Sequence, residues 1–101
     1  TFCPMGPWLV SKDSLDIANT SIKCWVNGEL RQDGNTSQFI FDIPTLIATI
    51  SAGITLYPGD IIATGTPSGV GMGFKPAKFL QSGDRIRIEI HGIGYLENSV
   101  A

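Results

Sequence analysis

The clearest periodic pattern in the sequence lies near its end, where apolar and charged positions alternate. Residues 85–90 read Arg-Ile-Arg-Ile-Glu-Ile, and after a turn at 91–94 the chain returns through 95–97. Alternation with a period of two places every second side chain on the same face of a strand. The pattern therefore predicts a terminal β-hairpin with one solvent-exposed and one buried face.

A second hairpin is predicted around the dipeptide Asn27-Gly28. Residues 22–26 alternate apolar with polar or small side chains, and residues 29–32 follow the dipeptide as a return strand. Asn-Gly is the favoured pair for a two-residue type I′ turn, because both central residues need a positive φ. Residues 33–37, which read Asp-Gly-Asn-Thr-Ser, are rich in turn-forming side chains and predict a further turn.

One helix is predicted between the hairpins, over residues 43–52. Asp42 is suited to cap its N-terminus, since a carboxylate accepts a hydrogen bond from a free backbone N–H of the first turn. Three apolar side chains recur at helical spacing and indicate its buried face: Leu46, Ile47 and Ile50.

Two further apolar stretches predict an irregular connection and a strand. Residues 1–10 mix two prolines and a glycine with large apolar side chains, which favours an irregular connection packed against the domain. The turn-forming residues 58–60 precede the apolar pair 61–62, and the same Gly-Asp turn precedes residues 85–90, so we expect a strand to begin at residue 61. Together the elements predict a β-rich α+β fold with a short helix.

Composition and charge narrow the class of protein. The chain has 101 residues, is 43% hydrophobic and carries a net charge of −2, as expected for one folded domain. No basic cluster offers the positive surface that nucleic-acid binding requires. The longest uncharged stretch, residues 43–59, is interrupted by proline and glycine and is shorter than the roughly 20 apolar residues of a membrane span. We therefore expect neither a nucleic-acid nor a membrane partner.

The cysteines indicate a reducing compartment, and the N-terminus suggests that the chain is part of a longer protein. Cys3 and Cys24 are too few for a disulfide framework and have no metal-type partner nearby in sequence, so we expect both to be reduced and buried. The chain begins without Met and without the regions of a signal peptide, which favours a piece of a longer protein. The single histidine, His91, falls at the predicted turn of the last hairpin and is expected to be solvated.

Residues 61–73 have the composition of a ligand-binding loop. Four of them are glycines, which allow close backbone approach and can present N–H groups to an anion. Thr64, Thr66 and Ser68 add hydroxyl donors for a carboxylate or phosphate. The segment lacks the ending of a phosphate-binding P-loop and the spacing of the dinucleotide fingerprint. The residues alone leave two interpretations open: an anion-binding loop and a purely structural glycine-rich turn.

Seven segments, in this order, resemble the C-terminal half of the fumarylacetoacetate hydrolase family: residues 2–8, 26–29, 31–32, 35–36, 57–60, 64–71 and 92–94. The run Thr-Gly-Thr-Pro-Ser-Gly-Val-Gly at 64–71 is the most specific of them. The resemblance covers residues 2–100 and is closest to the branch of 2-hydroxyhepta-2,4-diene-1,7-dioate isomerases, acylpyruvate hydrolases and oxaloacetate-handling relatives.

The resemblance implies a fold and an assembly. Family members have a mixed β-sheet roll with short helices, in which strands of the two halves pair, and they usually form homodimers. Residues 1–101 would then be the C-terminal part of a single catalytic domain, and the missing N-terminal half of that domain would be a partner. A cytoplasmic enzyme is implied, or a mitochondrial one if the source is eukaryotic.

The resemblance also implies a Mg²⁺- or Mn²⁺-dependent enzyme acting on 2-oxo or enol carboxylates. The reaction would be C–C bond hydrolysis of acylpyruvate-type substrates or isomerisation of 2-hydroxyhepta-2,4-diene-1,7-dioate. The family's metal ligands, two Glu and an Asp, and its catalytic Lys precede the position of Phe2, and Lys12, Lys75 and Lys78 do not match that Lys. We therefore expect no catalytic residue and no metal ligand in this chain, and no activity from it alone.

One contact carries over from the family to this sequence. Thr66, the second Thr of Thr-Gly-Thr-Pro, matches the hydroxyl that binds the substrate carboxylate, and Gly65 offers close backbone approach. Two alternatives stay open. One is an oxaloacetate decarboxylase or tautomerase of the same family, and the other is a non-catalytic β-module, because a shared fold does not guarantee a shared function.

Overall fold

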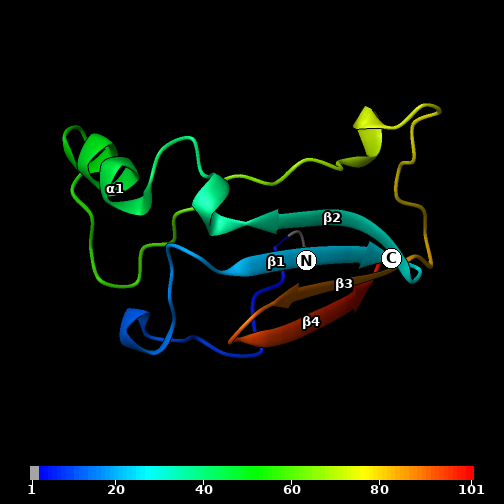
Figure 1. The fold of residues 1–101 in the computed structure, drawn as a ribbon, viewed down its shortest axis with the longest axis horizontal. Helices are drawn as coiled ribbons and strands as arrows, with labels where there is room; N and C mark the ends of the chain where they lie inside the picture. The colour runs from blue at the N-terminus through cyan, green and yellow to red at the C-terminus, as the bar shows by residue number, and fades with distance from the viewer. Residues whose placement is uncertain (1–2) are drawn as a thin grey trace.

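The computed structural model describes residues 3–101 and shows one four-stranded antiparallel sheet with the order β2-β1-β3-β4 (Figure 1). The strands are β1 (Ser21–Val26), β2 (Glu29–Asn35), β3 (Arg85–Ile90) and β4 (Gly94–Ser99). One α-helix, α1 (Ile43–Ser51), lies beyond one end of the sheet. Three single-turn 3₁₀ helices complete the described structure: η1 (Lys12–Ser14), η2 (Thr36–Gln38) and η3 (Gly71–Gly73). The α+β class predicted from the sequence is confirmed.

Both predicted hairpins are confirmed. Asn27 and Gly28 have φ values of 51° and 82°, which is the pair of positive values that a type I′ turn needs. They connect β1 to β2, with Val26 opposite Glu29. The final hairpin joins β3 to β4, with Ile90 opposite Gly94.

The two hairpins are joined through the pairing of β1 with β3, from Ile22 opposite Ile90 to Val26 opposite Ile86. At one end of this pairing, the side chain of Asn27 donates a hydrogen bond to Asp84 at 2.8 Å. The same carboxylate accepts the backbone N–H of Gln81, also at 2.8 Å. These two hydrogen bonds, helped by the charge of Arg31, lower the pKa of Asp84.

The predicted helix is confirmed, ending one residue earlier than expected. The carboxylate of Asp42 accepts the backbone N–H of Thr45 at 2.9 Å, as an N-cap does, and hydrogen bonding to Thr45 lowers the pKa of Asp42. The predicted buried face is only partly correct. Leu46 and Ile50 are half-buried, whereas Ile47 is exposed, because no described element packs against the outer side of α1.

The turn predicted at residues 33–37 is wrong in its first part. Strand β2 continues to Asn35, which pairs with Ser21, and only then does the chain turn into η2. Gly34 is buried within the strand, and a Cβ at this position would lie 2.8 Å from the Cβ of Pro67. The glycine therefore permits a close approach between β2 and the segment that contains Pro67. Such a close approach is a common reason for glycine within a strand.

The strand predicted from residue 61 is absent. The preceding turn does form, since the backbone N–H of Tyr57 donates to the side chain of Asp60 at 2.8 Å. Residues 61–70 form no strand, residues 66–69 lie against β2 without joining the sheet, and Ile61 is exposed (Figure 1). An apolar run becomes a strand only where another strand supplies hydrogen-bond partners, and no described strand does so here.

Very little of the apolar surface is buried. Among the residues that the structure describes, Val26 is the one large apolar side chain in the buried class, and Thr20 is the most buried polar one. The packing predicted for residues 1–10 is wrong for Met5, Trp8 and Leu9, which are exposed, while residues 1–2 lie outside the described range. A single sheet layer with a helix off its end leaves both sheet faces without a second layer.

Other predicted features of the surface have mixed outcomes. Cys3 is exposed and Cys24 is half-buried, so the expected burial is wrong for the first and partial for the second. Burial raises the pKa of the Cys24 thiol. Ile88, on the predicted buried face of the last hairpin, is exposed for the same lack of a second layer, whereas His91 is solvated as predicted. Within residues 3–101, no helix has the length and apolar character needed to cross a membrane.

Candidate functional site

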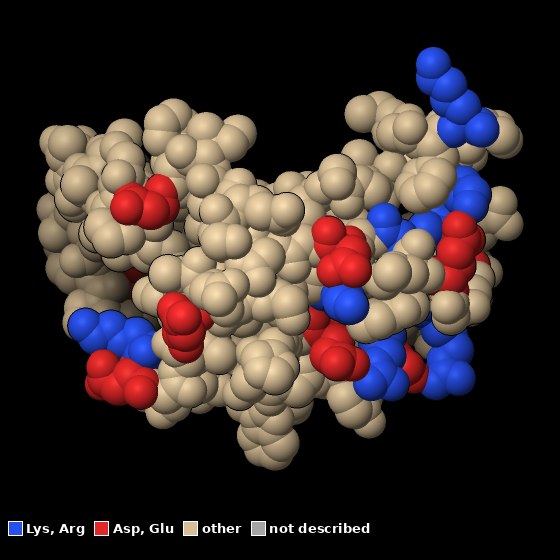
Figure 2. Space-filling model, viewed as in Figure 1, with Lys and Arg blue, Asp and Glu red and all other residues tan. Residues whose placement is uncertain are grey.

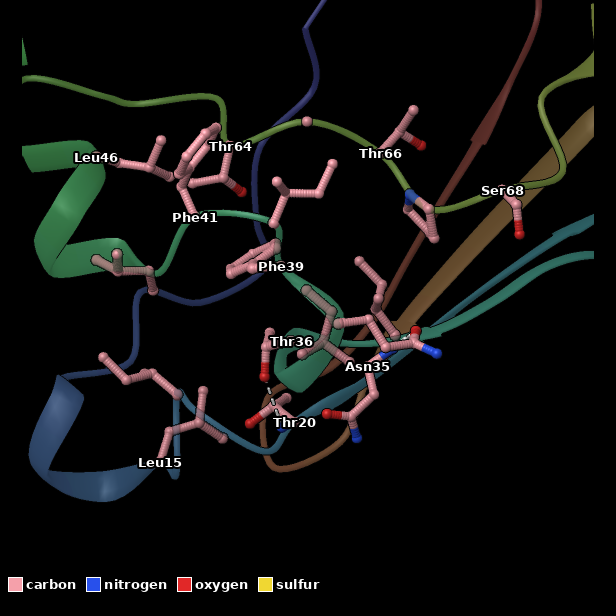
Figure 3. Close-up of a pocket in the computed structure, with 18 of the residues that line it drawn as sticks. Leu15, Thr20, Asn35, Thr36, Phe39, Phe41, Leu46, Thr64, Thr66 and Ser68 are labelled. Carbon is pink, nitrogen blue, oxygen red and sulfur yellow. Dashed lines mark hydrogen bonds between the residues drawn. The ribbon is translucent and has the colours of Figure 1, made fainter. Parts of the chain in front are cut away.

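A cavity of about 800 Å³ lies where η2, the start of α1 and the segment 64–68 meet (Figure 3). One part of its wall is apolar and includes Phe39, Phe41 and Leu46. The other part is polar and is supplied by the loop predicted from sequence. The predicted site residues Thr66 and Gly65 both line the cavity, together with Thr64 and Ser68.

The hydroxyl groups of the cavity differ in what they already bind. Thr36 accepts the backbone N–H of Thr20 at 2.8 Å, and the hydroxyl of Thr20 donates to the carbonyl of Asp16 (Figure 3). These two groups hold the floor of the cavity together. The loop hydroxyls of Thr64, Thr66 and Ser68 are exposed, and no acceptor for them is found within residues 3–101. They are among the groups in the lining that remain able to donate to a ligand.

The segment that carries Thr66 is fixed to β2 by one side chain. The Nε2 of Gln32 donates to the hydroxyl oxygen of Thr66 and to the carbonyl oxygen of Pro67, both at 2.8 Å. Sequence reasoning missed this residue. Its only signal was the Arg-Gln pair at 31–32, which belonged to the family resemblance but had no assigned role.

Two glycines let the same loop lie flat against its neighbours. A Cβ at Gly69 would lie 1.9 Å from the carbonyl oxygen of Arg31, and the φ of Gly69 is +106°. A Cβ at Gly71 would lie 2.2 Å from the carbonyl oxygen of Lys78. Gly65 differs, because its Cβ position has no heavy atom within 4 Å and its φ is +104°. The backbone at Gly65 is therefore open to a ligand, whereas Gly69 and Gly71 are needed for packing.

An ionic cluster of Glu29, Arg31 and Lys78 holds residues 74–78, which follow the glycine-rich loop, against β2. Glu29 pairs with Arg31 at 3.1 Å and with Lys78 at 2.5 Å, and the hydrogen bond from Lys78 is the main reason that the pKa of Glu29 is lowered. Both cations also lie over the ring of Phe74, with Arg31 at 5.2 Å and Lys78 at 4.8 Å from its centroid. Lys78 is thus engaged in holding residues 74–78 against β2.

The cavity has almost no charge of its own. Among the described residues, Asp33 is the one charged residue in its lining, and this carboxylate pairs with Lys23 at 3.4 Å. Figure 2 shows that most charged side chains on the visible face gather over the strands, while the hollow in the upper edge is bordered by uncharged atoms. Residues 3–101 therefore offer hydrogen-bond donors to an anion but no neutralising cation at the cavity.

The donor set does not fit a divalent-metal centre. Mg²⁺ and Mn²⁺ need several oxygen ligands that converge on one point. Residues 3–101 contain no group of three or more His, Cys, Asp or Glu side chains placed to hold a metal ion. The described residues therefore offer a bound molecule hydrogen bonds and not a set of metal ligands.

Known proteins resemble this chain over its whole length. It is 58% identical over 101 residues to the oxaloacetate tautomerase YisK of Bacillus subtilis, covering 99% of this chain and 34% of that protein. The structure matches a fumarylacetoacetate hydrolase of the psychrophilic Exiguobacterium antarcticum with a TM-score of 0.95 and 50% identity, over 98% of this chain and 36% of that one.

A third match includes bound ligands. Maleylpyruvate hydrolase of Sphingobium sp. SYK-6, in complex with manganese(II) and pyruvate, superimposes with a TM-score of 0.89 and 50% identity, over 99% of this chain and 36% of that one. The chain thus spans about a third of the length of these relatives. The family model described as fumarylacetoacetate (FAA) hydrolase C-terminal matches residues 1–101. With fold, loop and family model in agreement, the chain belongs to the fumarylacetoacetate hydrolase family.

Proposed function

We propose that this chain supplies the carboxylate-binding loop of an enzyme that acts on 2-oxo or enol carboxylates. The observation that carries the proposal is the exposed hydroxyl of Thr66 at the cavity, beside the open backbone of Gly65. A hydroxyl donor and a close backbone suit a carboxylate oxygen. The apolar wall at Phe39 and Phe41 suits the carbon chain of the substrate.

Two reactions of such substrates are proposed first: hydrolysis of a C–C bond in acylpyruvate-type compounds and isomerisation of 2-hydroxyhepta-2,4-diene-1,7-dioate. The similarity to maleylpyruvate hydrolase supports hydrolysis. The 58% identity to an oxaloacetate tautomerase supports a second candidate, tautomerisation of oxaloacetate. All three substrates carry a carboxylate beside an oxo or enol carbon, so the same loop serves each reaction.

The rest of the site is assigned to other parts of the protein. We propose that Mg²⁺ or Mn²⁺ is held by residues outside 3–101, consistent with a relative whose structure contains manganese(II) and pyruvate. We also propose that the exposed apolar faces of the sheet and of α1 pack against the remainder of the catalytic domain and that the enzyme is a homodimer. Burial of apolar surface is the dominant favourable term in such packing.

The test is a substitution at Thr66 in the intact protein. Thr66→Val keeps the shape of the side chain and removes the hydroxyl. A hydrogen bond to a charged group contributes about 1.5–3 kcal/mol, so the KM for an active acylpyruvate or for oxaloacetate is expected to rise about 10- to 100-fold. Steady-state kinetics with Mg²⁺ or Mn²⁺ present measures this change.

The matched control is Thr55→Val, which makes the same chemical change at an exposed position outside the cavity lining. This control is expected to keep the KM of the unaltered protein. An unchanged KM in Thr66→Val would overturn the assignment of Thr66 to the substrate carboxylate. Absence of turnover with every 2-oxo carboxylate tried would instead favour the non-catalytic β-module.

A further inference from the structure

The amide group of Gln32 has a defined orientation in this structure. Its Nε2 lies 2.8 Å from the carbonyl oxygen of Pro67. A backbone carbonyl oxygen only accepts hydrogen bonds, so the Gln32 atom that faces it must be the NH₂ group and not the amide oxygen. The chemistry of Pro67 thereby fixes which way the Gln32 amide is turned.

That orientation determines the role of the Thr66 hydroxyl. The same Nε2 lies 2.8 Å from the Thr66 oxygen, and its second hydrogen points to that oxygen because the first is used by Pro67. Thr66 therefore accepts from Gln32, and its own O–H proton must point elsewhere. No acceptor for this proton is found within residues 3–101.

We propose that Gln32 is a positioning residue that presents the Thr66 hydroxyl as an obligate donor to the substrate carboxylate. The inference rests on the proposed function of Thr66 and adds a specificity element to it. A hydroxyl group both donates and accepts when it is free to rotate. Because its oxygen already accepts a hydrogen bond from Gln32, the Thr66 hydroxyl favours an anionic oxygen, which only accepts hydrogen bonds. It disfavours a ligand group that is itself a hydrogen-bond donor.

Three features of the site agree with this role. Gln32 lies on β2, an edge strand of the sheet, and its backbone is held there by the pairing of Gln32 with Cys24 of β1. Its side chain is half-buried, which restricts its rotamers. The part of the chain that the structure describes places no cation in the cavity lining, so recognition of an anion there depends more on how each hydrogen-bond donor is oriented.

The test compares two substitutions of Gln32 in the intact protein, with pyruvate as the probe in calorimetric titrations. Gln32→Met removes the donor and is expected to weaken pyruvate binding about 3- to 10-fold. Gln32→Glu places an acceptor beside Thr66, which draws the hydroxyl proton away from the ligand. We expect this variant to weaken binding at least as much as Thr66→Val does, about 10- to 100-fold.

Two further readouts separate positioning from mere support of the loop. In the Thr66→Val background, Gln32→Glu is expected to cause no further loss of pyruvate affinity, because the hydroxyl that it misdirects is gone. In turnover assays the Gln32 variants are expected to raise KM and leave kcat within about twofold, as loss of uniform binding does. Gln81→Met, the same change at an exposed position outside the cavity, is the matched control.

The outcomes distinguish the two proposals. If Thr66→Val leaves pyruvate affinity unchanged, the proposed function of Thr66 fails. If Thr66→Val weakens binding but Gln32→Glu weakens it no more than Gln32→Met, the positioning role of Gln32 alone is refuted. Should Gln32→Glu fail to fold, Gln32→Met and its coupling to Thr66→Val decide the question, since independent losses from the two changes would contradict the proposal.

Discussion

The residue on which the candidate site most depends for its shape is Gly69. Its φ of +106° is a conformation that L side chains rarely adopt, and the carbonyl oxygen of Arg31 occupies the place of a Cβ. The contacts of Gln32 with Thr66 and Pro67 lie three and two positions earlier in the same segment, and we expect them to weaken if this close approach is lost. Gly69 thus determines where the Thr66 hydroxyl lies without facing a ligand itself.

Gly69→Ala is expected to destabilise the intact protein by roughly 2–5 kcal/mol, the sum of backbone strain and overpacking against β2. Gly73→Ala is the control, because a Cβ at Gly73 meets nothing within 4 Å and its φ is not in the positive range. That variant is expected to change stability by less than about 0.5 kcal/mol. Urea unfolding of the two variants measures the difference, and equal midpoints would show that the close approach is not maintained in solution.

Where strand β1 meets strand β3, the side chains of Asn27 and Asp84 form a hydrogen-bonded latch between the two hairpins. Asn27 in the β1–β2 turn donates to Asp84, and the amide oxygen of Asn27 accepts the backbone N–H of Arg85 at 2.9 Å. The turn of one hairpin is thereby tied to the first residue of the other. The backbone N–H of Gln81 and the side chain of Asn27 both donate to Asp84 and favour its carboxylate form, so the strength of the latch depends on pH.

The pKa of Asp84 in the folded protein is lowered from its ordinary value of 3.8. Its contribution to stability is therefore complete above that pH and is lost as the pH falls through the lower pKa of the folded state. We expect the unfolding midpoint of the intact protein to exceed that of Asp84→Asn at pH 6 and the gap to narrow towards pH 3. A gap that stays constant over this range would contradict the latch.

The sequence predicted those elements whose signals are local. The Asn27-Gly28 turn, the Asp42 cap and the alternation at 85–90 each act within a few residues, and all three are found. Gly34 was misinterpreted as part of a turn because its actual neighbour, Pro67, is distant in sequence. The strand expected from Ile61 failed for a related reason, since an apolar run does not reveal whether a partner strand is present.

The same distinction applies to the candidate site. Thr66 and Gly65 were predicted from the composition of their own loop and from the family resemblance, and both line the cavity. Gln32 was not predicted, because a glutamine on a strand has no special local pattern and its role depends on a contact 34 positions away.

At the scale of the whole molecule, apolar side chains are left in contact with solvent on several surfaces. Leu9 is 99% exposed and Ile40 is 91% exposed, and Trp8, Ile61 and Phe79 are each exposed by about two-thirds. Exposed patches of this kind in a folded protein mark surfaces that pack against another part or another chain. This agrees with a chain that spans about a third of its relatives.

Residues 1–101 produced on their own are expected to bind a hydrophobic dye such as ANS and to self-associate, because these surfaces have no cover. They are also expected to show no turnover of oxaloacetate or acylpyruvates with Mg²⁺ or Mn²⁺. Light scattering, dye fluorescence and the same kinetic assay measure the three properties. Metal-dependent turnover by this piece alone would refute the assignment of the metal site to residues outside 3–101.

The order of strands in the sheet also has a consequence during synthesis on the ribosome. Asn27 and Asp84 meet although 57 positions separate them, so β1 and β3 pair across a long excursion of the chain. Forty-nine residues lie between the end of β2 at Asn35 and the start of β3 at Arg85, and translating them at about 5–20 residues per second takes roughly 2–10 s. For that time the β1–β2 hairpin is complete while one edge of β1 has no partner. An unpaired edge is a template for pairing with other chains, so this interval is when the nascent protein most needs a chaperone.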